Sequence, residues 1–207
     1  MDQQTTAIAT TLASQAAEKT SNFISEVIGD NLKNAVGLMG ADWLLVKREE
    51  NLEQLRRKKD ERLSIRGIAD TVPVSLSIAI PLIRGAADES RDEIQDLWAA
   101  LLAAALDPNR GKDVTRFFID VLQKMEPWDA KVFQAIWTYE PDLNKEDTMA
   151  ARMGASLNSR ESKVLSCFAN LVDLGLVKAR GPGNYFHDYY EVVLTARGRE
   201  LIELLQD

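Results

Sequence analysis

The sequence predicts a mainly α-helical protein, with helical hairpins in its N-terminal region followed by a domain that carries one small β-hairpin. Apolar residues recur every three to four positions along most of the 207 residues, which is the spacing of helices that bury one face. The stretch Leu174 to Gly198 instead predicts two short strands around a Gly-Pro-Gly turn. Hydrophobic residues make up 45% and charged residues 28% of the chain, as in ordinary soluble globular proteins.

Residues 1–30 form the first predicted segment, a weakly amphipathic helix rich in alanine, threonine and serine. A helix with so thin an apolar face gains little by burial against its own chain. We therefore expect it to be ordered by a partner or by a second copy. Its apolar positions at near-helical spacing are Ile8, Leu12, Ala16, Phe23, Ile24, Val27 and Ile28.

Residues 31–126 form the second predicted segment, a helical domain. Asp30 or Asn31 can cap its first helix, which runs into the charged tract Lys47 to Arg62. The tract holds seven basic and five acidic residues, a pattern typical of a solvated helical face. The alternative is a surface that docks a partner, nucleic acid or anionic lipid. Its centre would be four consecutive basic residues that point to different sides of a helix: Arg56, Arg57, Lys58 and Lys59.

The most apolar window of the chain runs from Ile68 to Ile83 and contains Asp70, Pro73 and Pro81. It is shorter than the ~20 residues that a membrane span needs. We therefore expect a buried segment broken by its prolines, and no integral membrane segment.

Two strongly amphipathic helices are predicted next, over 94–105 and 114–125, and the short connection between them favours a helical hairpin. Asp107-Pro108 should end the first helix. Acidic residues gather around its start. A metal site in a helical bundle would also recruit carboxylates or histidines from other helices, so we assign these residues to the helix dipole and to solvation, and predict no metal site. The acidic residues are Glu89, Asp92, Glu93 and Asp96.

Residues 127–207 form the third predicted segment. Three short helices, a hairpin of strands Leu176 to Arg180 and Tyr185 to Leu194, and a last helix follow one another. This is the order of a winged helix-turn-helix. Local signals mark the helix ends: Asn144 before the second helix, Asn158 or Ser159 before the third, Gly175 after it and Thr195 before the last.

A winged helix favours DNA binding only if it offers basic side chains. The candidates are Arg160 and Lys163 on the third helix with Lys178 and Arg180 in the hairpin, and acidic neighbours balance them. Residues 128–207 hold nine basic and twelve acidic residues, and the whole chain has a net charge of -7 and a pI near 4.9. Attraction to a phosphate backbone would be weak, so nucleic-acid binding is a disfavoured alternative.

Catalytic signals are scarce. Arg180 and His187 have the spacing of a helical ribonuclease family of antiviral defence, but the Gly-Pro-Gly turn between them places them on a turn and a strand. The single cysteine, Cys167, lies among apolar residues, cannot form an internal disulfide and predicts a buried, inert thiol in a cytoplasmic protein. The chain has no phosphate-cradling loop, nucleophile elbow or cysteine pair. We therefore predict no catalytic residue, no cofactor and no enzymatic activity.

The order and spacing of several features resemble the abortive-infection alpha (Abi-alpha) family of bacterial proteins. These features are Trp43 before a mixed-charge helix, the step Leu63 to Ile68, Pro81-Leu82 leading into acidic residues, and the run Leu97 to Pro108. The ending from Leu174 to Gly198 also resembles that of family members. The resemblance thus covers most of the chain after residue 30 or so.

The resemblance implies a role in bacterial defence against phage, in which an infected cell arrests or dies. It brings no catalytic residues with it. We therefore expect a non-enzymatic phage-defence protein that acts through protein–protein interaction, with a partner or as a homo-oligomer. A winged-helix transcriptional regulator is the alternative, and an RNase-type toxin that uses Arg180 and His187 is a weaker one.

Overall fold

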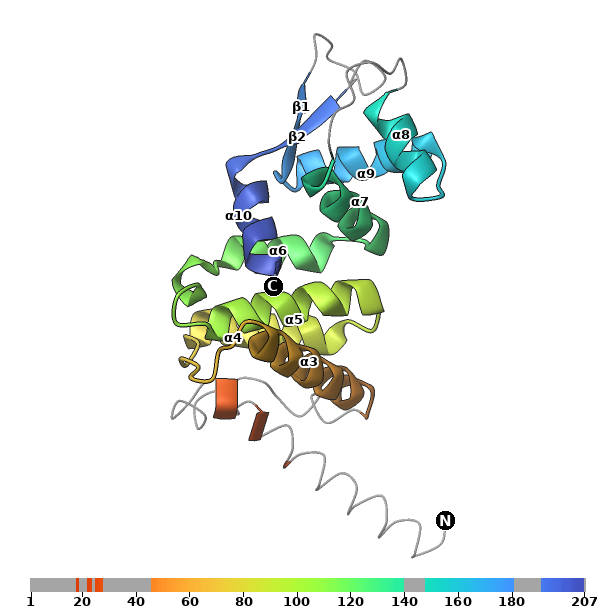
Figure 1. Ribbon diagram of the computed structural model, residues 1–207. Coiled ribbons are helices and arrows are strands. Elements are labelled where there is room, and N and C mark those ends of the chain that lie inside the picture. The colour runs from red at the N-terminus through yellow and green to blue at the C-terminus, as the bar shows by residue number, and fades with distance from the viewer. Residues whose placement is uncertain are drawn as a thin grey trace, which may run out of the picture. The chain divides into compact units, whose positions relative to one another are not determined.

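The computed structural model describes residues 18, 22–23, 25–27, 46–139, 148–180 and 191–206 (Figure 1). Within these ranges the chain is mainly helical and has one two-stranded antiparallel sheet near its C-terminus. This confirms the predicted fold class. The chain divides into two compact units, Met1–Gln123 and Lys124–Gln206, which we call the N-terminal unit and the C-terminal unit.

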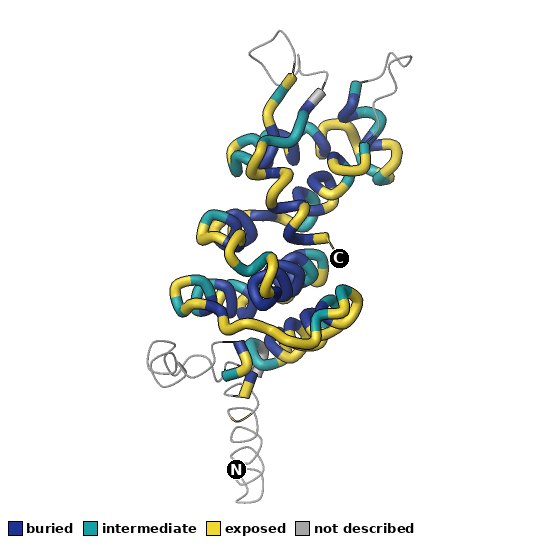
Figure 2. The backbone as a smooth tube through the Cα atoms, turned by 60° about the vertical axis from the view of Figure 1, so that its left-hand side comes forward, coloured by how far each residue is buried: buried dark blue, intermediate teal, exposed yellow. Residues whose placement is uncertain are grey.

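Three helices form the core of the N-terminal unit. The first, α3 (Val46–Ile65), packs against α4 (Leu76–Asp88) and α5 (Asp92–Leu106). Every residue of α5 from Leu97 onward is buried, and this helix is dark blue almost throughout in Figure 2. Its many alanines leave room for neighbouring helices to approach closely. The helix ends at Asp107, as predicted.

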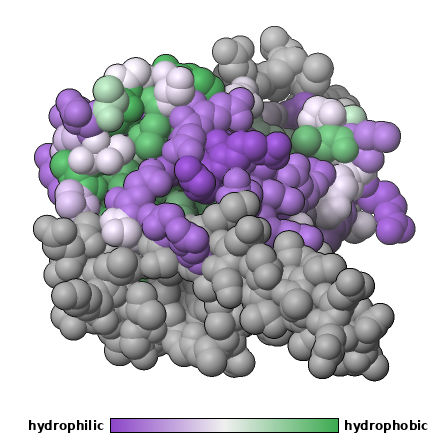
Figure 3. Space-filling view, turned by 90° about the horizontal axis from the view of Figure 1, so that it is seen from below, coloured by the Kyte–Doolittle hydropathy of each residue, from purple (hydrophilic) through white to green (hydrophobic). Residues whose placement is uncertain are grey.

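The charged tract lies on α3, which also carries one apolar stripe along its length. Leu52, Leu55 and Leu63 are buried in this stripe. Lys59 stands four residues after Leu55, where helical spacing predicts an apolar side chain, and it too is buried. Apart from the exposed Ile65, the rest of the described surface of α3 is polar. Hydrophilic side chains (purple) dominate the described part of the view from below (Figure 3).

The α4 helix continues through Pro81, so the prediction of a segment broken at both prolines is wrong at this position. Proline has no amide hydrogen, and the carbonyl of Ser77 therefore loses its usual helical partner. Nη1 of Arg116 donates to that carbonyl over 3.2 Å. Arg116 begins α6 (Arg116–Lys124), so a side chain from another helix satisfies the group that the proline leaves open.

A close contact joins α4 to α5. A Cβ placed on Gly85 would lie 2.6 Å from Cη2 of Trp98, which is closer than van der Waals contact allows. Trp98 itself is buried. Glycine is thus needed here for space rather than for backbone freedom. A short 3-10 turn, η3 (Gly111–Asp113), follows α5 and precedes α6.

Part of the predicted N-terminal helix is described and contacts this core. Phe23 and Val27 are buried, and the amide of Val74 donates to the carbonyl of Val27 over 2.9 Å. Residues 22–23 and 25–27 therefore belong to the N-terminal unit. The rest of residues 1–30, except Glu18, and the predicted cap at Asp30 or Asn31 lie outside the described residues.

The C-terminal unit has the predicted order of three helices, a hairpin and a last helix, and the winged-helix assignment stays a prediction. The strands pair antiparallel with Val177 opposite Leu194 and Arg180 opposite Glu191. The elements are α7 (Pro127–Trp137), α8 (Met149–Ser156), α9 (Glu161–Asp173), β1 (Val177–Arg180), β2 (Glu191–Leu194) and α10 (Ala196–Leu205).

The helix starts differ in part from the prediction. Thr148 caps α8, and its hydroxyl accepts the amide hydrogen of Ala151 over 3.1 Å. The predicted cap Asn144 lies outside the described residues. The N-cap of α9 is Arg160, not Asn158 or Ser159. Asn158 has a φ of 50°, so it makes the left-handed bend that a short polar residue tolerates.

Thr195 ties the last helix to the hairpin, as its predicted capping role requires. Its hydroxyl accepts the amide hydrogen of Gly198 over 3.0 Å and donates to the carbonyl of Gly175 over 2.7 Å. A Cβ on Gly198 would collide with the carbonyl oxygen of Leu176. The sequence Leu-Thr-Ala-Arg-Gly therefore fixes α10 closely against the start of β1. The predicted turn and residues 181–190 lie outside the described ranges.

Candidate functional site

The four residues predicted for the DNA-binding alternative are all exposed. Arg160 and Lys163 lie at the start of α9, while Lys178 and Arg180 lie on β1. Glu161 stands between the first two, and its carboxylate accepts the hydroxyl hydrogen of Thr148 over 2.5 Å. The structure thus presents these cations to solvent with an acidic residue among them.

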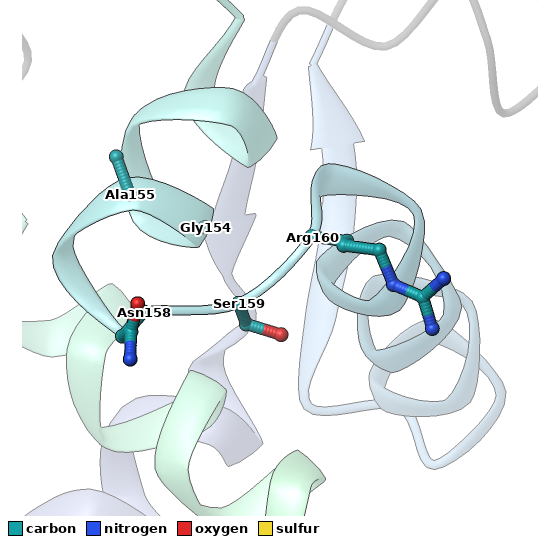
Figure 4. A pocket seen from close by; sticks show the side chains of 5 residues that line it. All are labelled: Gly154, Ala155, Asn158, Ser159 and Arg160. Atoms are coloured by element: carbon teal, nitrogen blue, oxygen red, sulfur yellow. The ribbon is translucent and has the colours of Figure 1, made fainter.

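A hollow of about 460 Å³ lies at the turn between α8 and α9. It is lined by Gly154, Ala155, Asn158, Ser159 and Arg160. Figure 4 shows that the side chain of Arg160 extends away from Asn158 and Ala155, so these side chains do not converge on one point. The hollow has no arrangement that could carry out chemistry on a bound molecule.

The predicted docking tract is divided between surface and interior. Arg56 and Arg57 are exposed. Nζ of Lys59 lies 2.5 Å from the carboxylate of Glu26 and 2.6 Å from that of Asp60, and the lysine side chain has no exposed surface. Lys58 is also turned inward, with 14% of its side chain exposed. The four residues therefore do not form one continuous exposed cluster.

Lys58 connects α3 to the acidic start of α5. Its Nζ lies 2.5 Å from Asp92 and 2.6 Å from Asp96. Burial alone would lower the pKa of Lys58, but the hydrogen bonds and charges of the two aspartates outweigh burial and raise it. The same contact lowers the pKa of Asp92. Two members of the predicted acidic set thus act in a charge cluster between helices, in addition to their place near the helix N-terminus.

Glu89 has a separate partner. The carboxylate of Glu89 accepts hydrogen bonds from the guanidinium of Arg91 over 2.8 and 2.9 Å and from the backbone amide of Arg91 over 2.8 Å. Burial would raise the pKa of Glu89, but these bonds lower it overall. The role of this carboxylate in the described structure is to hold the turn that precedes α5.

A groove with a volume of about 330 Å³ lies on the C-terminal unit, and we call it the C-terminal groove. Its floor is apolar, because Ile136, Met149 and Val192 are buried. Val193 and Leu194 of β2 extend the apolar lining and are half-buried. The amide of Val192 lies 3.5 Å from Sδ of Met149, which joins α8 to the hairpin beneath the groove.

The walls and rim of the C-terminal groove combine aromatic rings with positive charge. Trp137 is 38% exposed, and Tyr139 lies beside it. Nε of Arg152 donates to the hydroxyl of Tyr139 over 2.7 Å, which holds the hydroxyl end of the ring in place. Arg180 and Arg199 also line the groove, and among the lining residues that the structure describes none is acidic.

Two side chains that were considered for catalysis, Cys167 and Arg180, lie in the described part of the structure. Cys167 is buried, as predicted. Burial, with the carboxylate of Asp129 nearby, raises the pKa of its thiol to about 12, which keeps it protonated and unreactive at neutral pH. Arg180 is exposed on β1, whereas His187 lies outside the described residues.

Two further kinds of site are absent from the described part of the chain. Among the described residues, no group of three or more histidine, cysteine, aspartate or glutamate side chains is placed to hold a metal ion. In the same ranges, none of the helices combines the length and the apolar character that crossing a membrane requires.

Sequence reasoning missed the C-terminal groove. Its lining comes from α7, α8, the hairpin and α10, so it exists only once these elements pack. The continuous apolar run Val192 to Leu194 is a usable signal, because such a run predicts a strand that is apolar on both faces. Nothing in the sequence distinguishes the exposed Trp137 from a core tryptophan.

The fold and the groove together define a helical two-unit protein whose C-terminal unit carries a groove with an apolar floor. The abortive infection alpha family model matches residues 47–206 of the chain. The protein therefore belongs to the abortive infection alpha family, as the resemblance indicated. No curated protein and no solved structure matched the chain. Membership of the family implies a role in abortive infection, which defends bacteria against phage.

Proposed function

We propose that this abortive-infection protein has no catalytic activity of its own and acts in the cytoplasm by binding another protein through the C-terminal groove. One observation carries the proposal: Trp137, a large aromatic side chain, is 38% exposed beside a buried apolar floor. Protein interfaces combine such an apolar centre with a charged rim, and tryptophan, tyrosine and arginine dominate their binding energy. The groove contains all three residue types.

A phage-plating assay tests this proposal. Cells that produce the protein should reduce plaque number, and Trp137→Ala should abolish the reduction because it removes the aromatic wall. Trp128→Ala is the matched control, since Trp128 lies on the same helix and does not line the groove. Equal expression and equal melting temperatures must be verified for both variants. Full protection by Trp137→Ala would show that the groove is not needed.

Self-association is the second part of the proposal, and residues 1–17 are the segment to remove. A deletion of residues 1–30 would also remove Phe23, Glu26 and Val27, which contact the core of the N-terminal unit. A chain that lacks only residues 1–17 keeps those contacts. We expect light scattering to report a smaller assembly for the shortened chain, and an unchanged mass would contradict an assembly role for this segment.

DNA binding is the second candidate function, and one observation favours it: Arg160, Lys163, Lys178 and Arg180 are all exposed on α9 and β1. If these residues contact phosphate, affinity for duplex DNA should fall steeply with salt, and Lys163→Glu should weaken it further. Absence of binding at ~50 mM salt would exclude this candidate, because electrostatic attraction is strongest at low ionic strength.

A further inference from the structure

We propose that the C-terminal groove recognises an acidic segment of a partner protein in which one or two large apolar side chains are flanked by carboxylates. This inference rests on the proposed function and names the chemistry of the partner. It combines two observations: an apolar floor that is already formed, and a rim whose charged residues, within the part of the chain that the structure describes, are all positive.

The floor fits an apolar side chain. Ile136, Met149 and Val192 are packed into the core of the C-terminal unit, so they need not be ordered when a partner binds. Preformed surfaces of this kind avoid part of the entropy cost of association. The groove volume of about 330 Å³ lies near the lower end of typical ligand pockets. That is room for an anchor of one or two side chains.

The walls favour an aromatic or branched anchor. Trp137 supplies an exposed ring on one side. Tyr139 is held by Arg152, whose guanidinium donates to its hydroxyl. Rigid aromatic walls stabilise a bound apolar side chain by contact area and by ring packing.

The rim selects for negative charge. Arg180 and Arg199 come from β1 and α10, two segments that meet only in the fold, and both line the groove. Guanidinium groups stay charged at any physiological pH and bind carboxylates through paired hydrogen bonds. Arg180 stands opposite Glu191 in the strand register, so Arg199 is the better residue for a test.

A protein segment fits this lining better than a nucleic acid does. Among the described residues, nine line the groove and five of these are aliphatic side chains or methionine, whereas single-stranded nucleic acids are held by successive stacking platforms along a basic channel. Residues 128–207 are acidic on balance, with nine basic and twelve acidic residues. Local positive charge at the rim is therefore suited to a short acidic segment rather than to a long polyanion.

The test uses the full chain and end-blocked, dye-labelled peptides followed by fluorescence anisotropy at ~150 mM salt. The first peptide carries Phe-Leu between pairs of Asp-Glu. The second has Lys in place of each acidic residue, and the third has Ala-Ala in place of Phe-Leu. A single-stranded DNA of similar length is the fourth probe. We expect binding of the first peptide only.

The variant Arg199→Glu should weaken binding of the first peptide by about tenfold or more, because it reverses one rim charge. Arg197→Glu is the matched control: it changes the same charge on the same helix at an exposed residue that does not line the groove. Its affinity should stay at the parental value. Trp137→Ala should also weaken binding.

Several results would overturn the inference. The lysine peptide would bind as tightly as the first peptide or more tightly, or the DNA would displace the first peptide. Arg197→Glu would lose as much affinity for the first peptide as Arg199→Glu does. The first peptide would show no binding at ~1 mM, a concentration at which even a weak specific interaction is detected. Self-association that weakens in Arg199→Glu would assign the groove to a second copy instead. None of these outcomes decides the plating assay, so the groove can still be required for defence if the partner chemistry is wrong.

Discussion

Lys59 places an ammonium group inside the leucine stripe of α3. The side chain has no exposed surface, while its partners Glu26 and Asp60 are 43% and 53% exposed. A buried charge costs free energy unless its partners compensate, and carboxylates near the surface compensate only in part. The ion pair of Lys59 with Glu26 therefore links the N-terminal segment to α3. We expect the burial of the ammonium group to lower the free energy of unfolding.

We expect Lys59→Met to leave the free energy of unfolding within about 1 kcal/mol of the parental value or to raise it, because methionine fills the site without a charge. Glu26→Gln should lower it by about 1–2 kcal/mol, since it leaves the buried ammonium with Asp60 alone. Urea denaturation measures both. Glu61→Gln is the control at an exposed acidic residue of the same helix. Strong destabilisation by Lys59→Met would show that the ion pair contributes net stability.

The burial of Lys59 could have been inferred in part from the sequence. Leu52, Leu55 and Leu63 form a stripe in which position 59 is the missing member. Its partner could not have been inferred, because Glu26 is 33 residues away and meets Lys59 only through packing of the N-terminal segment. Helical periodicity identifies faces, but it does not identify the groups that a face contacts.

At the scale of elements, α10 is held at its start by one hydroxyl. Thr195 bonds both to its own helix and to the carbonyl of Gly175. Thr195→Ala should lower the free energy of unfolding by about 1–2 kcal/mol, because it removes an N-cap and a tether together. Thr195→Ser should retain most of the stability, since the serine hydroxyl can make the same bonds. Equal melting temperatures for the two variants would contradict this role.

The ion cluster between α3 and α5 should make stability depend on pH. The pKa of Asp92 is lowered from 3.8 in the folded state, so its contribution is present above that pH and is lost as pH falls through the lowered value. The pKa of Lys58 is raised from 10.5, so its contribution is present below that pH and is lost as pH rises through the raised value. The cluster stabilises the fold between these limits.

Lys58→Met measures this contribution. Because Asp92 is 78% exposed, the difference from the parental protein should be at most about 1 kcal/mol and should shrink in high salt. We expect it to be largest at about pH 7 and smaller at about pH 3 and pH 11. Arg57→Met, at the adjacent exposed position, should give a smaller change. A difference that does not vary with pH would assign the effect to packing alone.

The order of the elements was predictable because its signals are local. Apolar periodicity placed α5 and α9, Gly175 and Thr195 marked the ends of neighbouring helices, and these features appear in the structure. The prediction that Pro81 breaks the helix is wrong. The cost of a proline inside a helix depends on whether another group donates a hydrogen bond to the carbonyl four residues earlier. Arg116 does so from a different helix.

At the scale of the whole molecule, the net charge follows directly from the amino-acid composition. The net charge of -7 at pH 7 opposes nonspecific aggregation, because the molecules repel one another. We expect solubility to be lowest near the pI of about 4.9, where that repulsion vanishes. Light scattering at constant protein concentration measures this as the pH is lowered from about 8. Scattering that stays flat through the pI would mean that solubility does not depend on net charge.

Local charge, in contrast, was not predictable. Arg180 and Arg199 lie 19 positions apart in the sequence and line the same groove. Trp137 and Val192 come from still more distant elements. A binding surface assembled from several elements has no continuous pattern in the chain, so its partner chemistry can be read only from the fold.

The buried thiol of Cys167 has a practical consequence for the search for that partner. Cys167 is the single cysteine of the chain, and a pKa of about 12 keeps it silent toward maleimides under native conditions. A cysteine introduced as Arg197→Cys, two residues before the groove residue Arg199 on α10, would then be the reactive thiol, and Cys167 would need no substitution. A photo-crosslinker attached there could trap whatever occupies the groove during infection, and the trapped peptide could be identified by mass spectrometry.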